Sequence, residues 1–403
     1  MGVEISRRAR EFYIKEKDGD IVEMNREIKP TQPVMPKMEE YMREIRSIWD
    51  TKTMTNNGEK TRKFKEMLTE YTGCDNLDLF VNGHSALMIG ISALELEGEV
   101  ITSPFTFVST TNAIVQNGLI PVFGDIDDSY NLTPASVRQL ITDKTCAIVT
   151  PHIFGIPCDV EEMEAIANEY GLKVIYDGAQ AFGTKVGGKA VGSFGDVTMF
   201  SLHAIKVFNS IEGGILSYHD QDLHRKFELY RNFGISYGEL GNDVDVVGLN
   251  GKMNEFQAAM GIVNLPGLDE EIKKRKQLAQ LYCEYLKDVP GIETYSYRAD
   301  VEYNYAYFPV KVTEEYGMTR DELWLRLKEA GIGTRKLYDK LTCDYRCYKD
   351  KGYVRKTEYA DKVKRMALDL PMYGELGEED VAIICETIKR IGQHQILCIK
   401  KYQ

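Results

Sequence analysis

The sequence predicts an α/β protein in which a large domain built on a mostly parallel sheet is followed by a smaller C-terminal α+β domain. Two observations indicate this fold. From about residue 75 the chain alternates short apolar runs with segments of helical period, which is typical of βαβ units. The chain also has 403 residues, of which 43% are hydrophobic, and this length accommodates a large core and a second, smaller domain.

Strands and helices are expected in regular alternation in the first part of the chain. Short apolar runs predict strands over 77–81, 99–103, 120–123, 145–150 and 172–177. Segments of helical period predict helices over 85–96, 109–117, 134–142 and 160–170. A further apolar strand begins at Val197 and leads toward Lys206. Because a helix between two strands returns the chain to the same edge of the sheet, these strands are expected to run parallel.

The remaining segments indicate the domain boundaries. The glycine-rich stretch 183–196 follows no strand-to-helix turn, and we interpret it as a hairpin rather than a nucleotide-binding loop. A long helix over 268–286 is expected to connect the domains, and the smaller domain is predicted to contain strands over 293–297 and 307–312 and helices over 320–330 and 378–391. We therefore expect an N-terminal arm (1–30), a large cofactor-binding domain (31–267) and a small C-terminal domain (268–403).

Composition excludes several classes of function. The formal net charge is -12 and no basic run occurs, so a nucleic-acid partner is not expected. No apolar window reaches about 18 residues and the first residues lack the apolar core of a signal peptide, so we expect a cytoplasmic protein without membrane spans. The eight cysteines are scattered, and only Cys343 and Cys347 lie close together, without a nearby histidine; neither disulfides nor a metal site is predicted.

Two strand ends carry the residues that point to chemistry. Lys206 follows an apolar strand, where a lysine is costly to hold charged, and a lowered amine pKa is what imine formation needs. Asp177 ends the strand before it and is followed by Gln180. Carboxyl ends of parallel strands share one edge of a sheet, so these groups can meet one ligand. Taken singly, each has an ordinary structural reading: Lys206 in a salt bridge, Asp177 as a helix N-cap, Gln180 in solvent.

Other strand ends complete a set that fits pyridoxal 5'-phosphate (PLP). Asn82-Gly83-His84-Ser85 stands between a strand and a helix, where free N–H groups favour a phosphate, although a glycine in such a turn is more often structural. Phe105 or Phe107 can stack on a flat ring, or be a core aromatic. Ser201 offers a hydroxyl to phosphate, and Asp177 can pair with a protonated pyridine nitrogen.

These residues stand in motifs that resemble the DegT/StrS-type, PLP-dependent sugar nucleotide aminotransferases. The resemblance extends over roughly residues 30 to 400, and the motifs that carry it are Asp177-Gly-Ala-Gln180-Ala, Ser201-Leu-His-Ala-Ile-Lys206, Glu212-Gly-Gly, Asn82-Gly-His-Ser-Ala-Leu, Ser103-Pro-Phe-Thr-Phe-Val-Ser-Thr, Pro121-Val-Phe-Gly-Asp-Ile-Asp127 and Gly248-Leu-Asn250-Gly-Lys-Met-Asn254. It implies a fold-type I PLP enzyme with a seven-stranded sheet, a homodimer with shared active sites, and nucleotide-linked keto sugars as substrates.

The resemblance also implies roles for individual residues. Lys206 is the Schiff-base lysine and Asp177 the pyridine partner, while Gln180 contacts the ring hydroxyl. Gly83, His84, Ser85 and Ser201 form the phosphate cradle. Of the two candidate rings, Phe107 is the one we assign to the cofactor. Asn250 is a phosphate contact given to the partner subunit's site. Positional resemblance alone suggests substrate contacts for Thr55, Asn56, Lys336 and Tyr338.

Three positions depart from the usual pattern of the family, and none removes a catalytic function. His84 stands where a phosphate-contacting threonine is usual, Phe182 replaces a common histidine, and Ile211 replaces the usual glycine before Glu212. Other segments resemble the branch that aminates C4 of dTDP-4-keto-6-deoxyglucose, namely Trp49 to Gly58, Gly98-Glu-Val-Ile, Asn209 to Gly214 and Gly251-Lys-Met-Asn-Glu. The implied product is dTDP-4-amino-4,6-dideoxy-D-glucose.

The expected reaction is a ping-pong transamination in which an amino acid, glutamate by resemblance, gives its amino group and a keto sugar takes it. Two alternatives stay open. A sugar dehydratase of the same fold is one, although relatives that dehydrate replace the lysine with histidine, so Lys206 favours transamination. A ligand-sensing protein on this fold is the other, although no helix-turn-helix or basic surface supports it. The sequence leaves open the nucleotide (dTDP, UDP or GDP), the sugar's stereochemistry and C3 against C4 amination.

Overall fold

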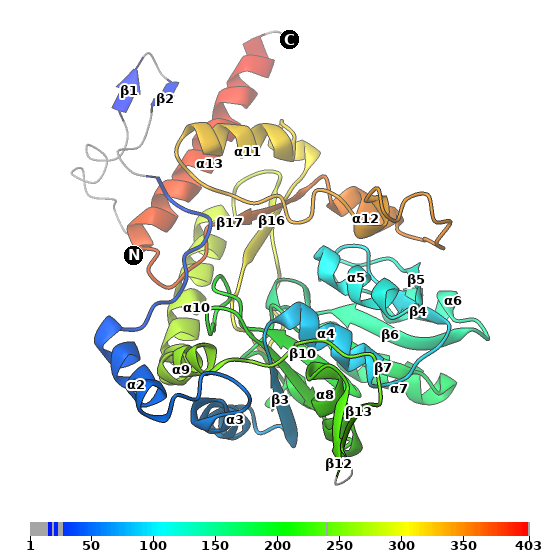
Figure 1. The fold of residues 1–403 in the computed structure, drawn as a ribbon. Helices are drawn as coiled ribbons and strands as arrows, with labels where there is room; N and C mark the ends of the chain where they lie inside the picture. Colours follow the sequence, from blue (N-terminus) through cyan, green and yellow to red (C-terminus); the bar gives the residue numbers. More distant parts are fainter. Residues whose placement is uncertain (1–14, 18–19, 23–26, 239–240, 402–403) are drawn as a thin grey trace.

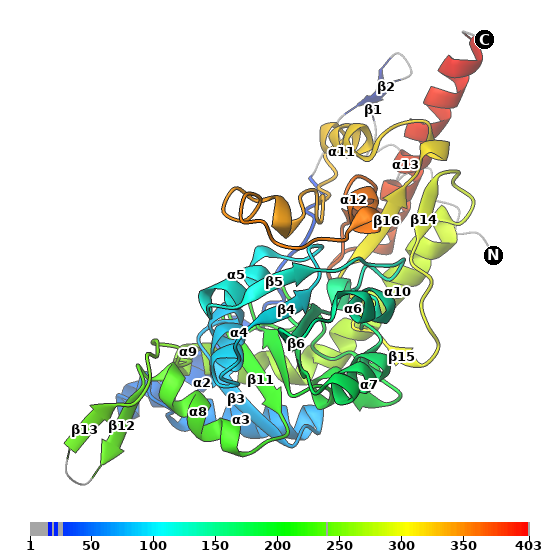
Figure 2. The ribbon, with the colours of Figure 1, turned by 90° about the vertical axis from the view of Figure 1, so that its right-hand side faces the viewer.

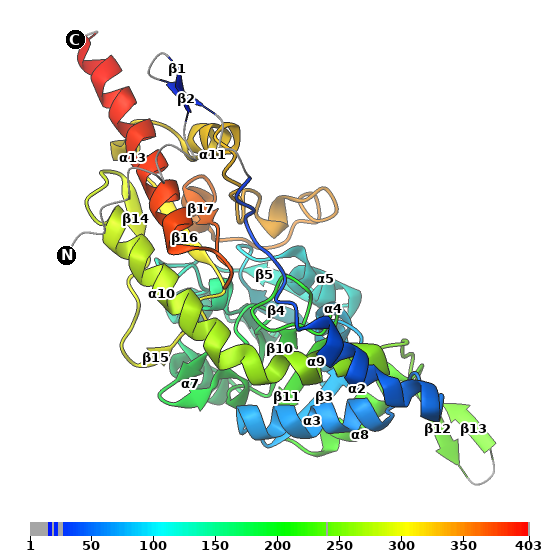
Figure 3. The ribbon, with the colours of Figure 1, turned by 90° about the vertical axis from the view of Figure 1, so that its left-hand side faces the viewer.

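The computed structural model describes residues 15–17, 20–22, 27–238 and 241–401. The described chain has two parts, which the long helix α10 (Leu268–Leu286) joins as predicted (Figures 1 and 3). Most of the predicted N-terminal arm lies outside the described residues; its described pieces include the antiparallel pair β1 (Lys15–Lys17) and β2 (Asp20–Val22).

The larger part is built on the mostly parallel seven-stranded sheet that the sequence predicts. Its strand order is β3 (Asn76–Phe80), β11 (Gly214–Tyr218), β10 (Val197–Ser201), β7 (Lys173–Asp177), β6 (Thr145–Pro151), β4 (Glu99–Thr102) and β5 (Ile120–Phe123). All pairings are parallel except those of β11, which runs antiparallel to both of its neighbours.

Helices cover both faces of this sheet and bury a separate apolar core on each. Side chains alternate between the faces along a strand: Ile175 belongs to one core, and Val174 and Tyr176 belong to the other. The core of Ile175 contains residues of α4 (Gly83–Ser92), α5 (Val108–Gln116) and α8 (Asp222–Arg231). The opposite core contains residues of α3 (Glu59–Thr72), α6 (Pro134–Leu140), α7 (Val160–Tyr170) and α9 (Glu255–Asn264). Helix α2 (Met38–Thr51) packs on α9 through a small cluster of its own.

The smaller part is the predicted α+β unit with its own core. Its antiparallel sheet has the order β14 (Ile292–Thr294), β16 (Phe308–Val312) and β17 (Ala367–Leu370), and it packs with α10, α11 (Arg320–Glu329) and α13 (Glu378–Lys401). The short α12 (Glu358–Val363) precedes β17 (Figure 1). Ile28, near the end of the predicted arm, pairs with Ile332 and is 2% exposed within this core. The end of the arm therefore packs into the small part of the molecule.

The predicted hairpin over 183–196 is confirmed. Strands β8 (Lys185–Val186) and β9 (Lys189–Ala190) flank a turn in which Gly187 and Gly188 both have positive φ, the conformation that a two-residue hairpin turn demands. β8 also pairs with β15 (Val301–Glu302) from beyond α10, so chain on both sides of residue 267 meets in one sheet. The division at residue 267 stays a prediction.

Some element ends differ from expectation for local reasons. The strand expected over 293–297 ends at Thr294, and beyond it Tyr295 and Tyr297 pack against each other edge to face. Helix α4 ends at Ser92, ahead of Glu95, which has a φ of 52°. The hairpin of β12 (Ile235–Gly238) and β13 (Gly241–Val244) projects from the body of the molecule (Figures 2 and 3). Among the described residues, no helix has both the length and the apolar content needed to cross a membrane.

Candidate active site

A cavity of about 450 Å³ lies where the carboxyl ends of five parallel strands meet, at the edge where open α/β sheets bind ligands. Segments that follow β3, β4, β6, β7 and β10 each contribute to its wall, and residues beyond α10 close it. The residues that line it include Gly83, His84, Phe107, Asp177, Gln180, Ser201, Lys206, Arg335 and Tyr338.

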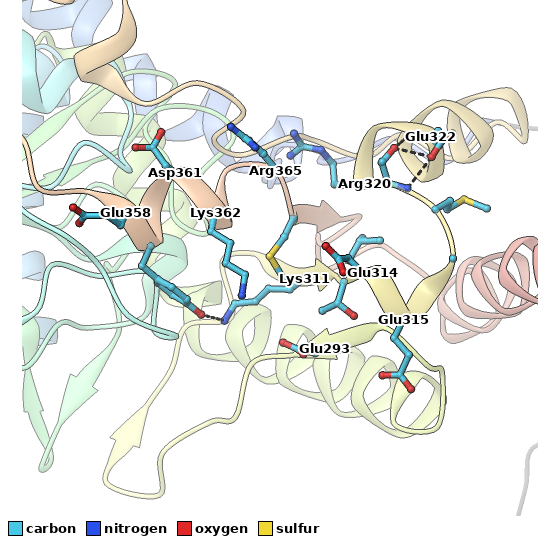
Figure 4. A pocket seen from close by; sticks show the side chains of 17 residues that line it. Glu293, Lys311, Glu314, Glu315, Arg320, Glu322, Glu358, Asp361, Lys362 and Arg365 are labelled. Carbon is cyan, nitrogen blue, oxygen red and sulfur yellow. Dashed lines mark hydrogen bonds between the residues drawn. The ribbon is translucent and has the colours of Figure 1, made fainter.

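A second cavity, of about 1170 Å³, lies in the smaller part of the molecule between β16, α11 and α12 (Figure 4). Its walls carry charges of both signs, and two of its basic groups are engaged. Lys311 Nζ donates to Asp128 and to the Tyr359 hydroxyl, and Arg320 donates to the Ala367 carbonyl and to Asp321. None of the predicted site residues lines this cavity, so the chemistry belongs to the smaller one.

Lys206 lies in the turn that follows β10 and is half-buried in the wall of the cavity. Its backbone N–H donates to the His203 carbonyl at 2.9 Å, which fixes the turn. Within the described part of the chain, the Lys206 ammonium makes no ion pair. The reading of this lysine as an ordinary salt-bridge residue therefore has no support, and the amine is available to a ligand.

Asp177 ends β7 and is only 6% exposed. Its carboxylate accepts a hydrogen bond of 2.6 Å from the Thr110 hydroxyl and one of 3.1 Å from the Ala179 backbone. Burial raises the pKa of Asp177, and the two hydrogen bonds and the nearby positive charge of Lys206 oppose that rise. Turns rather than an α-helix follow Asp177, so it is not a helix cap.

The start of α4 provides an anion site next to Ser201. The Asn82 side chain caps the helix by accepting from Ser85 N–H at 2.8 Å, while the first amides of a helix, here those of Gly83 and His84, have no acceptor within the helix. A Cβ added at Gly83 would lie 2.9 Å from Ser201 Cβ, so only glycine lets the helix start and Ser201 approach this closely. Gly83, His84 and Ser201 line the cavity; Ser85 is half-buried on the same turn.

The His84 ring bonds to a neighbouring helix. Its Nδ1 lies 2.8 Å from the Ser109 hydroxyl, and its Nε2 lies 3.2 Å from Gln116 Oε1. Ser109 lies in the first turn of α5 and Gln116 is its last residue, so His84 joins the start of α4 to both ends of α5. The contribution of His84 to an anion is therefore its backbone N–H.

Gln180 and Tyr338 form one contact across the cavity wall. Gln180 Nε2 donates to the Tyr338 hydroxyl at 2.9 Å, while Gln180 Oε1 accepts from the Phe154 backbone. Tyr338 is 7% exposed, and burial raises its pKa. The contact ties the turn after Asp177 to a segment that lies far along the chain.

The two candidate stacking rings lie in different environments. Phe105 is fully buried in the core, where its ring stacks on that of Tyr130 at 6.1 Å. Phe107 caps α5, lines the cavity and is 63% exposed. Phe107 is therefore the ring that a flat ligand can meet.

Five predicted residues do not line the cavity in this single chain: Ser85, which lies on the turn described above, and the four that follow. Thr55 and Asn56 are exposed in the loop between α2 and α3. Lys336 turns toward α11, where its Nζ lies 3.3 Å from Asp321 and 4.7 Å from the centre of the Trp324 ring. Asn250 is exposed and pairs with Asn232 at the base of the projecting hairpin.

Sequence reasoning gave no role to several residues that the fold brings to this site. Thr110 ends the quoted motif that begins at Ser103, so its position was available as a signal, but its contact with Asp177 is long-range. Arg335 lies in the segment from which Lys336 and Tyr338 were chosen. Tyr307 also lines the cavity, under the Arg335 guanidinium at 4.9 Å. No local pattern distinguishes these two from ordinary core residues.

The residues present fit PLP. The start of α4 and Ser201 suit a phosphate, a buried acceptor-only carboxylate at Asp177 suits a protonated pyridine nitrogen, and Lys206 offers an amine without an ion-pair partner among the described residues. Another candidate group, Asp78, His224 and Glu228, could in principle hold a metal ion. Asp78 instead forms ion pairs: its Oδ1 lies 3.1 Å from Lys65 Nζ and 3.3 Å from Arg231 Nη1. Two positive side chains beside this carboxylate disfavour the binding of a metal cation there.

Comparison with known proteins gives a consistent result. The DegT/DnrJ/EryC1/StrS aminotransferase family model matches residues 36–389. A Shigella dysenteriae protein named dTDP-4-amino-4,6-dideoxy-D-glucose transaminase is 37% identical over 369 residues, which cover 91% of this chain and 100% of that protein.

Solved structures share the fold of this chain. That of DesI in the presence of its TDP-sugar product has a TM-score of 0.87 and 28% identity, covering 95% of this chain and 97% of that one. The PLP form of the putative sugar aminotransferase Spr1654 from Streptococcus pneumoniae has a TM-score of 0.84 and covers 92% and 99% of the two chains; its 23% identity supports the shared fold.

Proposed function

This chain belongs to the DegT/DnrJ/EryC1/StrS aminotransferase family, and we propose that its acceptor is dTDP-4-keto-6-deoxy-D-glucose and its amino donor L-glutamate. As a family member it is a PLP-dependent aminotransferase of nucleotide-linked sugars. The proposed product is dTDP-4-amino-4,6-dideoxy-D-glucose. The name of the Shigella relative supports this choice, and so does the resemblance of the segment from Trp49 to Gly58 to the same branch.

The observation that carries the proposal is the meeting of Lys206 and Asp177 at one cavity beside the start of α4. PLP, when bound, supplies an electron-withdrawing ring that stabilises negative charge on the carbon that exchanges its amino group. We propose that Lys206 Nζ holds the cofactor and, once released, moves the proton at the reacting substrate carbon. Its lack of an ion pair within the described residues leaves this amine free to do both.

Asp177 is proposed to hold the proton on the pyridine nitrogen. An ionised carboxylate stabilises that positive charge, and it does so most strongly in a buried site with a low effective dielectric constant. The Thr110 hydroxyl and the Ala179 amide keep the carboxylate oriented and favour its ionised form. Thr110 is thereby a positioning residue that acts through Asp177.

The remaining cavity residues are proposed to bind and orient. The backbone amides of Gly83 and His84, with the hydroxyls of Ser85 and Ser201, would hold the phosphate. Gln180 would donate to the ring hydroxyl, and Phe107 would cover the ring face. Tyr338 would approach the substrate, whereas Thr55, Asn56 and Lys336 could contribute to substrate binding only if loops or a partner subunit bring them closer.

We also propose that the active form is a homodimer with shared sites. Helix α2 presents three large apolar side chains at helical spacing that are more than half exposed: Met38 at 71%, Met42 at 55% and Trp49 at 64%. The projecting hairpin adds two further exposed side chains, those of Tyr237 and Val244. Asn250, at the base of this hairpin, is exposed in the single chain and is proposed to contact the phosphate in the partner's cavity.

A product assay tests the substrate assignment. The PLP-loaded protein would be incubated with L-glutamate and one keto sugar in each of three parallel reactions: dTDP-, UDP- or GDP-linked 4-keto-6-deoxyglucose. The products would be separated and identified by mass spectrometry. The proposal expects an amino sugar from the dTDP substrate at the highest kcat/KM. Preference for UDP or GDP would overturn the nucleotide assignment. If the product has lost water instead of gaining an amine, the reaction is a dehydration and not a transamination.

A further inference from the structure

Asn304 is a buried residue between β15 and β16, and its side-chain amide contacts the turn that follows Asp177. The residue is 1% exposed. Its Nδ2 donates to the backbone carbonyls of Gln180 at 2.8 Å and of Phe182 at 3.0 Å, and its Oδ1 accepts from the Ala306 backbone N–H at 3.0 Å. An asparagine amide has two N–H groups. Both of them therefore hold the turn that carries Gln180 on the wall of the active-site cavity.

The turn after β6 has an unusual backbone conformation where it meets this amide. Gly155 has a φ of 79°, and a Cβ added there would lie 2.3 Å from Asn304 Oδ1 and 2.9 Å from the Gln180 carbonyl oxygen. Phe154, just before it, has a φ of 60°, which is rare for a large side chain, and its backbone N–H donates to Gln180 Oε1. Two adjacent left-handed residues thus pack against both the main chain and the side chain of Gln180. Conformations of this cost cluster at functional sites.

These contacts determine which atom of the Gln180 side chain is left for a ligand. Its Oε1 accepts from Phe154, so the atom that remains is Nε2, which can only donate. One N–H of Nε2 donates to the Tyr338 hydroxyl at 2.9 Å. Within the described chain the other N–H has no acceptor. That N–H is therefore available to an oxygen atom of a molecule bound in the cavity.

We propose that Asn304 is a positioning residue of the active site, which keeps the Gln180 donor directed at the ring oxygen of PLP by holding the Gln180 and Phe182 carbonyls. This inference rests on the proposed function, in which Gln180 donates to that oxygen and Lys206 holds the cofactor. A donor to the ring oxygen reduces the negative charge with which this oxygen stabilises a proton on the Lys206 nitrogen. Gln180 therefore lowers the pKa of the Lys206 nitrogen in the loaded protein, and Asn304 supports this effect without touching the cofactor.

A pH titration of the absorbance spectrum of the PLP-loaded protein tests the proposal without any turnover. The spectrum changes when the cofactor-linked Lys206 nitrogen gains or loses its proton, so the midpoint of the change reports the pKa of that nitrogen. We expect Asn304→Ala to raise the midpoint by about half a pH unit or more, the scale of one lost hydrogen bond. Asn117→Ala is the matched control and should leave the midpoint unchanged. Asn117 Nδ2 also donates to two backbone carbonyls, those of Met88 and Ala113, but it lies outside this cavity.

A double variant separates an effect through Gln180 from a general loosening of the fold. Gln180→Ala alone should raise the midpoint. Adding Asn304→Ala should shift it no further, because the donor that Asn304 positions is already gone. An equal further shift in the double variant, or an unchanged midpoint in folded Asn304→Ala, would overturn the proposal.

A second variant, Asn304→Ser, keeps the test valid if Asn304→Ala does not fold. Serine is shorter and has a single donor, so it cannot hold both carbonyls, and we expect a smaller shift in the same direction. An unchanged midpoint in the folded serine variant would equally contradict the proposal. A protein that aminates no dTDP-linked sugar but shows the pH-dependent spectrum would fail the proposed acceptor and leave this test intact. Normal amination with an unmoved midpoint in Asn304→Ala would fail this inference alone.

Discussion

The Thr110 hydroxyl donates a hydrogen bond of 2.6 Å to the Asp177 carboxylate, although the two residues belong to different βα units of the chain. Thr110 is fully buried in the first turn of α5, and Asp177 ends β7. Because burial raises the pKa of Asp177, this donor is one of the few groups that keep the carboxylate ionised.

Replacement of Thr110 with valine, which keeps the shape and removes the donor, should raise the pKa of Asp177 further. We expect the acid limb of the glutamate half-reaction to move to higher pH and its rate at neutral pH to fall by about tenfold, with partial recovery at higher pH. Stopped-flow absorbance of the bound cofactor measures both. Thr111→Val is the control, since its hydroxyl bonds to Thr342 instead; an unshifted profile in Thr110→Val would leave Thr110 a packing residue.

Asp177→Asn should separate stability from function. The folded pKa of Asp177 is raised, so the stability associated with its protonated form is present below its ordinary pKa of 3.8 and is lost as pH rises through the folded value. At neutral pH the buried carboxylate therefore costs stability, and asparagine removes that cost.

The cofactor-free Asp177→Asn protein should consequently melt higher than the parent at pH 7, with the difference shrinking toward pH 4. The half-reaction rate of the loaded variant should fall by orders of magnitude, because the charge opposite the pyridine nitrogen is lost. Thermal unfolding at both pH values and stopped-flow kinetics provide the measurements. A near-normal rate would reduce Asp177 to a structural role.

Ile211 has a φ of 70°, a left-handed conformation that is strained for a β-branched residue and explains why the family usually has glycine there. Ile211 is also 44% exposed, so its side chain contributes little to the core. Ile211→Gly should stabilise the protein by about 1 kcal/mol, measured by denaturant unfolding. Ile211→Ala retains a Cβ and should gain less; equal stability of the two variants would show that the backbone is not the source of the strain.

Subunit complementation tests the shared site. Lys206→Ala and Asn250→Ala subunits, each inactive alone, should regain activity on mixing, because one site of the heterodimer has both its lysine and its borrowed asparagine. The experiment requires that Asn250→Ala be impaired and that subunits exchange, which differently tagged chains can verify. If verified heterodimers stay inactive, Asn250 serves its own subunit or only the fold.

The sequence predicted the parallel part of the sheet because helices follow β3, β4, β5 and β6, and that order allows few topologies. It did not predict the antiparallel β11. The segment from Leu202 to Gly213 that joins β10 to β11 contains no helix, whereas a parallel return usually runs through one, but β11 was not identified from the sequence. The projecting hairpin of β12 and β13 was missed because its strands have no continuous apolar run and contribute no buried residue to a core.

The site could be predicted in part: Lys206 and Asp177, which lie at two strand ends, line one cavity, and their chemical roles remain proposals. It could not be predicted where a distant loop completes the cavity. In the segment after α11, Asp339 N–H bonds to the Lys336 carbonyl at 3.0 Å, and this turn separates Lys336, which faces Asp321, from Tyr338, which faces Gln180. Which residue of such a turn enters the cavity depends on tertiary packing, and Arg335 was therefore overlooked.

The position of the cofactor-binding lysine is the most direct test of the account. The PLP-loaded protein would be treated with borohydride, digested and analysed by mass spectrometry, with Lys206→Ala as the matched control. We predict that the added cofactor mass appears on the peptide containing Lys206 and is absent from the folded variant. Two results would contradict the assignment of the site. One is cofactor mass on a lysine other than Lys206 in the unmutated protein. The other is the same amount of attached cofactor in Lys206→Ala as in the unmutated protein.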